Sequence, residues 1–420
     1  MNKQGQSRRQ FLKTASAFTV GGVMAGCATT GQQTATVPKI AVPPRRTIGP
    51  GDPIRCGYIG VGGRGSSILQ SNLAMAGVEV VAVCDAYDVW RERALGWCRE
   101  HYPEVTGYIR FEDMLATENL DCVVIATPDH IHGPAILAAL EAGKDVYCEK
   151  PMTLTWEEAR AVRDTAQATG AVFQVGTQLR SMPMYQQVRD IVQSGGIGTL
   201  AEVQNNRHGW GGMSDYNVAP VEANEATCHW DVFLRDTPRY DFDARRFFQW
   251  RQFKEYSNGV SGDLMLHHLD LCHFITGCGM PTTVMSVGNI AAFHDGRTVP
   301  DTMSALIAYP EGFHLNHTTT LVNGEYGLVE RYLGSEGTIE IRDMSEMRII
   351  KDGEEEVINA GGIPNEPHLE DYFNAIRSRG QTIAPVEAGF MGAVVCHMAV
   401  LSQLSGQSMQ WDPDSQSVKM

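Results

Sequence analysis

The stretch Ile54-Arg55-Cys56-Gly57-Tyr58-Ile59-Gly60-Val61-Gly62-Gly63-Arg64-Gly65 decides the fold of this chain. Its first six residues predict a buried strand, a G-x-G-x-x-G pattern follows at once, and residues 66–75 have helical character. In such a unit Gly60 allows a tight turn, Gly62 lets the backbone approach a pyrophosphate, and Gly65 lets the helix pack closely on the strand. The free N–H groups at the helix N-terminus then bind the anion.

An acidic residue after the second predicted strand supports a dinucleotide site. The strand at 78–84 ends in Asp85, 20 residues past Gly65. A carboxylate there would accept hydrogen bonds from both ribose hydroxyls of NAD and repel the 2′-phosphate of NADP. The alternative is that Asp85 is the N-cap of the next helix. The spacing favours NAD.

The alternation of strands and helices continues through strands at 121–126 and 145–148, with a helix at 132–142 between them. This pattern predicts a parallel, doubly wound sheet, a Rossmann domain of the α/β class. Ligands of such sheets bind beyond the carboxyl ends of the strands. The loops at 127–130 and 149–151 are therefore expected on the rim where the nicotinamide should lie.

The alternation breaks after Gly198, which predicts a second, α+β domain with a large, mostly antiparallel open sheet. Segments with strand character follow one another without intervening helices, at 199–205, 283–290, 303–309, 313–321 and 337–341. Two amphipathic helices are expected near the C-terminus, at 367–379 and 388–405.

Motifs spread along the chain resemble the glucose-fructose oxidoreductase / inositol dehydrogenase family, Gfo/Idh/MocA. They are G-V-G-G-R-G at 60–65, A-T-P-D-H-I-H at 126–132, C-E-K-P at 148–151, G-T-Q-L-R at 176–180 and G-G-I-G at 195–198. The resemblance implies a Rossmann domain over 54–176 and a substrate and oligomerisation domain over 177–420, in a homo-oligomer (dimer or tetramer). With the fingerprint, it predicts NAD contacts from Gly60, Gly62, Gly63, Arg64, Gly65, Asp85, Thr127, Pro128, His132, Glu149, Lys150 and Gln178.

The segment Asp263-Leu264-Met265-Leu266-His267 predicts the catalytic side chains. Residues four apart share a helix face, so Asp263 and His267 can reach one site. The family places D-x-x-x-H here, and the match carries Asp263 and His267 over as catalytic partners of Lys150. Asp270 is as readily a structural residue. A zinc site is disfavoured because adjacent histidines point about 100° apart on a helix, so no metal is predicted.

If the reaction is oxidation of a secondary alcohol, NAD and the three predicted catalytic side chains each have a role. NAD accepts the hydride, His267 is the base because its ordinary pKa is about 6.5, and Lys150 stabilises the forming alkoxide. Asp263 would orient His267 or hold a second hydroxyl. The expected substrate is a carbohydrate, with contacts from Arg180, Trp230 and Arg251, although the Trp- and Arg-rich segment could equally be domain packing.

The first 27 residues are interpreted as an export signal. Ser7-Arg8-Arg9-Gln10-Phe11-Leu12-Lys13 matches the twin-arginine pattern, and Met24-Ala25-Gly26-Cys27 resembles a lipoprotein cleavage box. Lipidation of Cys27 and soluble release are both open, and residues 28–53 are expected to be a polar linker in a periplasmic protein. No transmembrane span is expected, and a net charge of −15 without a basic run argues against nucleic acid.

Export limits the reaction classes, because no pool of free NAD exists outside the cytoplasmic membrane. A carried cofactor must be restored at each turnover. The favoured hypothesis is an exported NAD-dependent oxidoreductase acting on a sugar, polyol or glycoside hydroxyl. One alternative is a redox-neutral NAD-dependent glycoside hydrolase or lyase; those family members lack the lysine of E-K-P, which this chain has at Lys150. The other is a non-catalytic sugar-binding lipoprotein.

Cysteine usage gives no sign of a disulfide framework. The chain has ten cysteines, and Cys56, Cys84, Cys122 and Cys148 lie in or beside predicted buried strands, where the thiol behaves as a small apolar group. No C-x-x-C occurs. Were a disulfide present, proximity would favour Cys272 with Cys278.

Overall fold

The computed structural model describes residues 40–209, 223–359 and 366–420. The twin-arginine motif and Cys27 lie outside the described residues, and so does the first part of the predicted linker. Residues 40–53, the rest of that linker, pack on the Rossmann domain. Arg46 forms a two-pronged hydrogen bond to Asp121, at 3.0 and 2.6 Å, and Arg45 donates to the carbonyl of Thr169. This end of the segment is therefore part of the folded domain.

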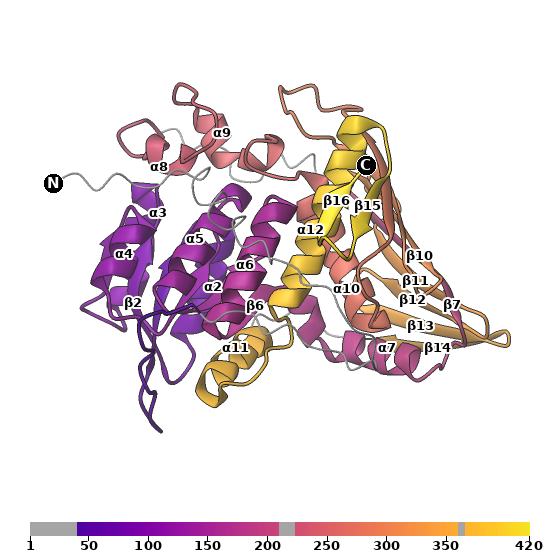
Figure 1. The fold of residues 1–420 in the computed structure, drawn as a ribbon, viewed down its shortest axis with the longest axis horizontal. Helices are drawn as coiled ribbons and strands as arrows, with labels where there is room; N and C mark the ends of the chain where they lie inside the picture. The colour runs from indigo at the N-terminus through magenta and orange to yellow at the C-terminus, as the bar shows by residue number, and fades with distance from the viewer. Residues whose placement is uncertain (1–39, 210–222, 360–365) are drawn as a thin grey trace, which may run out of the picture.

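The first domain is a parallel Rossmann sheet with helices on both faces (Figure 1). Its strand order is β3-β2-β1-β4-β5-β6. The strands are β1 Ile54–Ile59, β2 Val78–Cys84, β3 Thr106–Tyr108, β4 Cys122–Ile125, β5 Asp145–Glu149 and β6 Phe173–Gly176. The helices are α2 Gly63–Leu73, α3 Asp88–Arg99, α4 Phe111–Thr117, α5 Asp129–Glu141 and α6 Trp156–Thr169. The predicted fold class is confirmed here.

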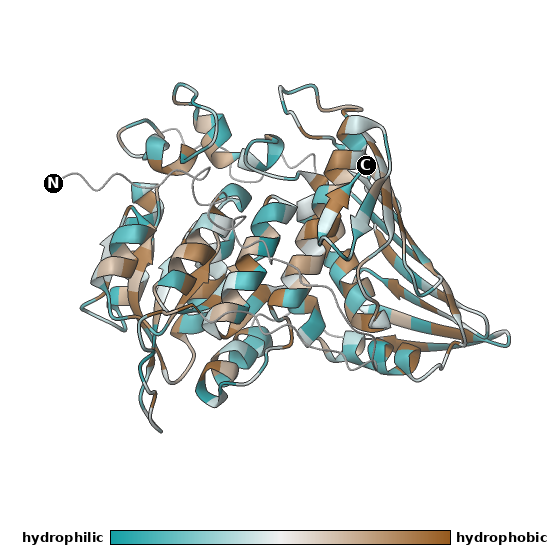
Figure 2. Ribbon diagram, viewed as in Figure 1, coloured by the Kyte–Doolittle hydropathy of each residue, from teal (hydrophilic) through white to brown (hydrophobic). Residues whose placement is uncertain are grey.

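The second domain is a ten-stranded sheet of order β14-β13-β12-β11-β7-β10-β9-β8-β15-β16. All its neighbouring strands run antiparallel except β7 and β10. The strands are β7 Leu200–His208, β8 Thr283–Asn289, β9 Thr302–Ala308, β10 His314–Thr320, β11 Leu328–Gly334, β12 Thr338–Arg342, β13 Glu346–Lys351, β14 Glu354–Asn359, β15 Met409–Asp412 and β16 Ser417–Lys419. Buried and exposed residues alternate along β10, because one face of the sheet is buried and the other is not, and brown and teal residues are interspersed along the strands of this sheet in Figure 2.

Helices join the two domains. The apolar core runs from the Rossmann sheet across α12 to the second sheet, and α12 packs against both α6 and β8. The remaining helices are α7 Pro183–Gln193, α8 Trp230–Leu234, α9 Ala244–Phe248, α10 Leu266–Thr276, α11 Glu366–Ser378 and α12 Val386–Ser405, with short 3₁₀ turns at Gln178–Ser181 and Trp250–Gln252. Among the described residues, α12 alone has the length and apolar composition of a membrane span, and just over half of its apolar window is buried inside the protein.

One local feature beside the predicted catalytic side chains differs from the sequence prediction. The helix expected from Asp263 begins with a π-helical turn, Ser261–Met265, before α10 starts at Leu266. Such a turn inserts an extra residue into the helix, and this geometry recurs at functional sites. The nine cysteines within the described ranges are all buried and free, including Cys272 and Cys278.

A segment of the second domain crosses the Rossmann domain. We call residues 223–257 the strap; it contains α8 and α9, which lie over the carboxyl ends of the parallel strands in Figure 1. Its backbone is hydrogen-bonded to the start of α3, from Asp88 N to Thr227 O (3.0 Å) and from His229 N to Ala86 O (2.9 Å). Aromatic residues of the strap also pack against the Rossmann domain.

Candidate active site

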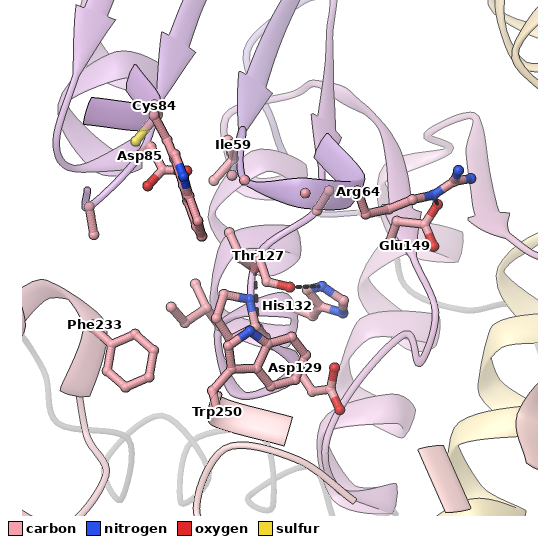
Figure 3. Close-up of a pocket in the computed structure, with 18 of the residues that line it drawn as sticks. Ile59, Arg64, Cys84, Asp85, Thr127, Asp129, His132, Glu149, Phe233 and Trp250 are labelled. Atoms are coloured by element: carbon pink, nitrogen blue, oxygen red, sulfur yellow. Dashed lines mark hydrogen bonds and ion pairs between the residues drawn. The ribbon is translucent and has the colours of Figure 1, made fainter. Parts of the chain in front are cut away.

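A cavity of about 510 Å³ lies where the carboxyl ends of β1, β2, β4 and β5 meet the strap and the π-helical turn (Figure 3). Two domains therefore contribute to it. Of the residues predicted from the sequence, those that line it are Gly60, Gly62, Gly63, Arg64, Asp85, Thr127, Pro128, His132, Glu149, Lys150, Gln178, Arg251, Asp263 and His267.

The glycine turn between β1 and α2 leaves no room for side chains. Gly60 has φ +85°, and a Cβ there would lie 2.7 Å from the carbonyl of Ala126. A Cβ on Gly65 would lie 2.0 Å from the Gly60 carbonyl oxygen, so helix and strand pack at the closest distance. No side chain caps the start of α2 and its first turn has no acidic residue. Its N–H groups are thus available to a pyrophosphate, and the turn fits a dinucleotide.

Asp85 is held beside this turn. Its carboxylate accepts hydrogen bonds from the backbone N–H groups of Val61 and Tyr87, both at 2.8 Å. Burial raises the pKa of Asp85 to about 6, against the effect of those two bonds. The N-cap position of α3 is Tyr87, so Asp85 is not that cap. Its position at the cavity is the one expected for a ribose-binding carboxylate.

Two buried groups tie the rim loops together. Glu149 accepts from Arg64 Nε and from Gln178 Nε2, each at 2.8 Å. Burial opposes ionisation of Glu149, but the Arg64 charge prevails and lowers its pKa. The ring nitrogens of His132 lie 2.7 Å from the Pro151 carbonyl and 2.9 Å from the Thr127 carbonyl. The loops after β4 and β5 are therefore held at a fixed separation.

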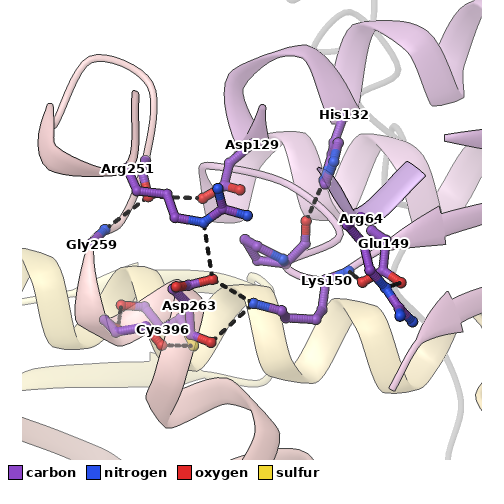
Figure 4. Close-up of polar contacts among 12 residues, drawn as sticks. Arg64, Asp129, His132, Glu149, Lys150, Arg251, Gly259, Asp263 and Cys396 are labelled. Atoms are coloured by element: carbon purple, nitrogen blue, oxygen red, sulfur yellow. Dashed lines mark hydrogen bonds and ion pairs between the residues drawn. The ribbon is translucent and has the colours of Figure 1, made fainter. Parts of the chain in front are cut away.

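Lys150 and Asp263 meet at the other end of the cavity (Figure 4). Lys150 Nζ donates to Asp263 Oδ1 at 2.7 Å and to its backbone carbonyl at 2.9 Å. Arg251 Nε approaches the same Oδ1 at 3.4 Å. Burial opposes ionisation of Asp263, yet these two cations lower its pKa well below its ordinary value. The carboxylate is thus a fixed anion that holds the ammonium in place.

His267 lines the same cavity from the first turn of α10. Its Nδ1 is buried and has no hydrogen-bond partner within the described parts of the chain. Burial, and then the positive charge of Lys150, lower its pKa well below the ordinary histidine value. The ring is therefore neutral at pH 7 and can accept a proton. The sequence spacing and the family resemblance together predicted that it lies with Asp263.

Two residues predicted to contact substrate do not line the cavity. Arg180 is buried and pairs with both carboxylate oxygens of Asp270 at 2.8 Å, which makes Asp270 structural. The Trp230 indole donates to the Tyr240 carbonyl at 2.8 Å and stacks on Phe233 with ring centroids 5.1 Å apart. Both side chains are used in packing. Their partners do not follow a regular spacing in the sequence, and Asp270 lies 90 residues from Arg180, so no local pattern predicted these contacts.

Several cavity residues were not singled out as site residues by the sequence interpretation, although some lie in segments that it did consider. They are Asp129, Val232, Phe233, Arg235, Phe247 and Trp250. All but Asp129 come from the strap, whose sequence alone did not distinguish a substrate wall from domain packing. The strap both packs on the Rossmann domain and lines the cavity: Trp250 faces the cavity, and Arg251 lies over its ring at 4.1 Å. His268 and His273, by contrast, are committed to Glu330 and to the Tyr309 hydroxyl.

Family models match both domains. Residues 54–177 match the model described as an oxidoreductase family with an NAD-binding Rossmann fold, and residues 185–340 match the GFO/IDH/MocA C-terminal domain. The chain belongs to the Gfo/Idh/MocA oxidoreductase family.

Sequence relatives of this Gfo/Idh/MocA chain include glycosyl hydrolase family 109 proteins. A glycosyl hydrolase family 109 protein of Shewanella baltica (strain OS185) is 35% identical over 171 residues, and one of Shewanella sp. (strain ANA-3) is 34% identical over 171 residues. Each match covers 39% of this chain and 37% of the relative. The chain thus spans little more than a third of the length of these curated relatives.

Solved structures share the fold over nearly their full length. Levoglucosan dehydrogenase in complex with NADH and levoglucosan has a TM-score of 0.68 at 19% identity, covering 86% of this chain and 99% of that one. Aldose-aldose oxidoreductase from Caulobacter crescentus, complexed with glycerol, has a TM-score of 0.66 at 17% identity, covering 85% and 99%. At these identities the likeness shows the fold alone.

Proposed function

We propose that this protein is an NAD-dependent oxidoreductase acting on a CH–OH group of a sugar, polyol or glycoside. The observation that carries the proposal is the arrangement of one cavity. The dinucleotide turn and Asp85 lie at one end, and Lys150, Asp263 and His267 meet at the other. A ligand that spans the cavity would place its reactive end beside an ammonium and a neutral imidazole.

Each side chain then has a defined task. When bound, NAD supplies the acceptor for the hydride that leaves the carbinol carbon. The Lys150 ammonium, held by Asp263 at 2.7 Å, stabilises negative charge on the substrate oxygen as its proton leaves. The neutral imidazole of His267 accepts the proton of the substrate hydroxyl. Arg251 and the face of Trp250 are placed to bind sugar hydroxyls and C–H surfaces.

The strap supports retention of the cofactor between turnovers. It covers the cavity with Phe233, Phe247 and Trp250, and Tyr87 of the Rossmann domain packs edge-on against Phe248 at 5.0 Å. The His130 ring and the Phe233 carbonyl also meet at 2.7 Å. A dinucleotide under this cover would be held more firmly while these contacts stay closed.

Retention agrees with the export that we propose from Ser7–Lys13. A periplasmic protein, released or anchored through a lipid on Cys27, would have to recycle its nucleotide internally. We further propose a homo-oligomer (dimer or tetramer) that covers the open face of the second sheet. That face exposes large apolar side chains, including Met285, Val287, Leu306 and Val357.

A second candidate is a redox-neutral NAD-dependent glycoside hydrolase or lyase. The names of the Shewanella relatives favour it. Against it stands Lys150, which is present and ion-paired with Asp263. The two candidates differ in one measurable quantity: cleavage of an aryl glycoside without lasting nucleotide reduction indicates the hydrolase, whereas a net change in nucleotide redox state indicates the oxidoreductase.

The proposal is tested on the purified, undialysed protein. We expect denaturation to release NAD in near-stoichiometric amount. The native protein is then titrated singly with D-glucose, D-galactose, myo-inositol, levoglucosan and p-nitrophenyl glycosides, while the reduced-nicotinamide absorbance and p-nitrophenol are followed. Bound NAD that no compound reduces, together with tight sugar binding, would favour the non-catalytic sugar-binding lipoprotein.

Asp85 should set the preference for NAD over NADP. Replacement Asp85→Ser removes the carboxylate that would repel a 2′-phosphate, so we expect the NAD/NADP affinity ratio to fall by about tenfold or more. Protein stripped of nucleotide and reloaded with either dinucleotide gives both affinities by fluorescence titration. Asp88→Ser, on the first turn of α3, is the control. An unchanged ratio in Asp85→Ser would remove Asp85 from the ribose site.

A further inference from the structure

Asp129 is a buried carboxyl of the cavity to which the proposed mechanism gives no part. It is the first residue of α5, directly after the Thr127-Pro128 rim loop, and only 3% of its surface is exposed. It lines the cavity together with Lys150 and Asp263. Figure 4 shows the Arg251 side chain between the carboxyls of Asp129 and Asp263.

The hydrogen bonds of Asp129 leave one oxygen for a ligand. Ser257 Oγ accepts from Gly259 N at 3.0 Å and donates its single proton to Asp129 Oδ2 at 3.0 Å. Lys150 and Arg251 both direct their charge to Oδ1 of Asp263. Asp263 therefore contacts two cations, whereas among the described residues Asp129 has a hydrogen bond from one neutral hydroxyl, to Oδ2.

The surroundings of Asp129 and Asp263 shift the pKa values of the two carboxyls in opposite directions. Burial raises the pKa of Asp129 to about 7; Arg251 and Lys150 oppose the rise and the Asp263 anion adds to it. The thiols of Cys148 and Cys396, also nearby, are neutral because burial raises their pKa values. A pair of carboxyls whose pKa values are driven apart in one site is the pattern by which acid–base residues are recognised.

His267 cannot by itself store the substrate proton. Its pKa is well below the ordinary value because burial and the Lys150 ammonium disfavour the imidazolium. It can accept a hydrogen bond from the hydroxyl and a proton in passing. Near neutral pH the proton will move to a group in the cavity that holds it more firmly, and Asp129 is such a group.

We propose that Asp129 is a further catalytic residue, the carboxyl on which the substrate's hydroxyl proton comes to rest. This inference rests on the proposed oxidoreductase function. In the step, the C–H bond breaks and its hydride goes to NAD, while the O–H bond breaks and its electron pair forms the C=O bond. The proton leaves the hydroxyl and ends on Oδ1 of Asp129, which lines the same cavity as His267. In the reverse direction Asp129 returns it to the carbonyl oxygen.

The first test is a pH profile of nucleotide reduction, using the panel sugar that reduces the holoenzyme fastest. Asp129 must be ionised to accept a proton, so wild-type kcat/KM should rise with pH through about 7 and then level off. Asp129→Asn, which still accepts from Ser257, should lower kcat/KM by about 10²–10⁴ and remove that ionisation. His267→Asn should lower the rate and keep the ionisation. The opposite pattern, with the ionisation lost in His267→Asn and kept in Asp129→Asn, overturns the proposal.

The second test needs no turnover. Infrared titration of the holoenzyme without sugar should show a protonated carboxyl band that disappears with a midpoint near pH 7 and is absent from Asp129→Asn. Ser257→Ala removes a hydrogen bond to the carboxylate and should move the midpoint up by about one unit. Asp190→Asn, in the exposed Arg189 pair, is the control and should leave the band unchanged.

The two proposals fail in distinguishable ways. If the carboxyl band that Asp129→Asn removes titrates below about pH 5, near ordinary carboxyl values, the role of Asp129 is overturned even if sugar oxidation is observed. Failure of every sugar to reduce bound NAD overturns the proposed function, and with it the source of the proton, even if the band titrates near pH 7.

Discussion

Lys150→Ala should lower kcat for sugar oxidation by about 10²–10⁴ while the protein keeps its bound NAD. The reason is that Asp263 fixes the Lys150 ammonium at the end of the cavity where we propose that the substrate binds. Without it, negative charge on the substrate oxygen would have no fixed counter-charge at that position. Stopped-flow absorbance of the reduced nicotinamide gives the rate, and nucleotide content per protomer gives retention.

The control for Lys150→Ala is Lys254→Ala, which removes an exposed lysine of the strap. It should change neither quantity. Turnover of Lys150→Ala near the wild-type value would show that the ion pair with Asp263 is structural. Loss of bound NAD in the variant would instead place Lys150 mainly in cofactor binding. These two results therefore separate a catalytic lysine from a scaffolding one.

The nucleotide end of the cavity could be predicted from sequence because its chemistry is local. The G-x-G-x-x-G turn and Asp85 lie within 26 residues. At each glycine of the motif, a Cβ would lie too close to a neighbouring atom. Asp263 and His267 were likewise predictable from their spacing. The π-helical turn was not, since it alters the start of the helix without a separate signal in hydrophobic periodicity.

The substrate end resisted prediction because its residues act through distant partners. Arg180 was predicted to contact substrate, but its guanidinium is paired with Asp270, 90 positions away in the sequence. Asp129 was recognised only as part of a rim loop; burial raises its pKa against the opposing effects of Arg251 and Ser257, which belong to the other domain. Strand segments such as β13 and β14 were missed because charged residues at many positions mask their alternation.

Phe248→Ala should make the retained nucleotide exchangeable. Phe248 is 1% exposed and packs edge-on against Tyr87 at 5.0 Å and Trp90 at 5.4 Å, which joins the strap to the Rossmann domain. Truncation of a buried Phe destabilises a protein by about 3–5 kcal/mol. If a loss of about 3 kcal/mol lowers the barrier to strap opening by the same amount, NAD dissociates about 10²-fold faster. Loss of NAD on gel filtration, and chase of bound nucleotide by labelled NAD, measure this.

Phe313→Ala is the matched control for Phe248→Ala. Phe313 is also buried, at 5% exposure, but it stacks on Tyr309 in the second sheet, away from the strap. Both variants should lose thermal stability by similar amounts, and only Phe248→Ala should release nucleotide. If Phe248→Ala is destabilised and still holds NAD as firmly as the wild type, the strap does not retain the cofactor. Retention would then depend on the glycine turn, Asp85 and the rim loops alone, and internal recycling would need another physical basis.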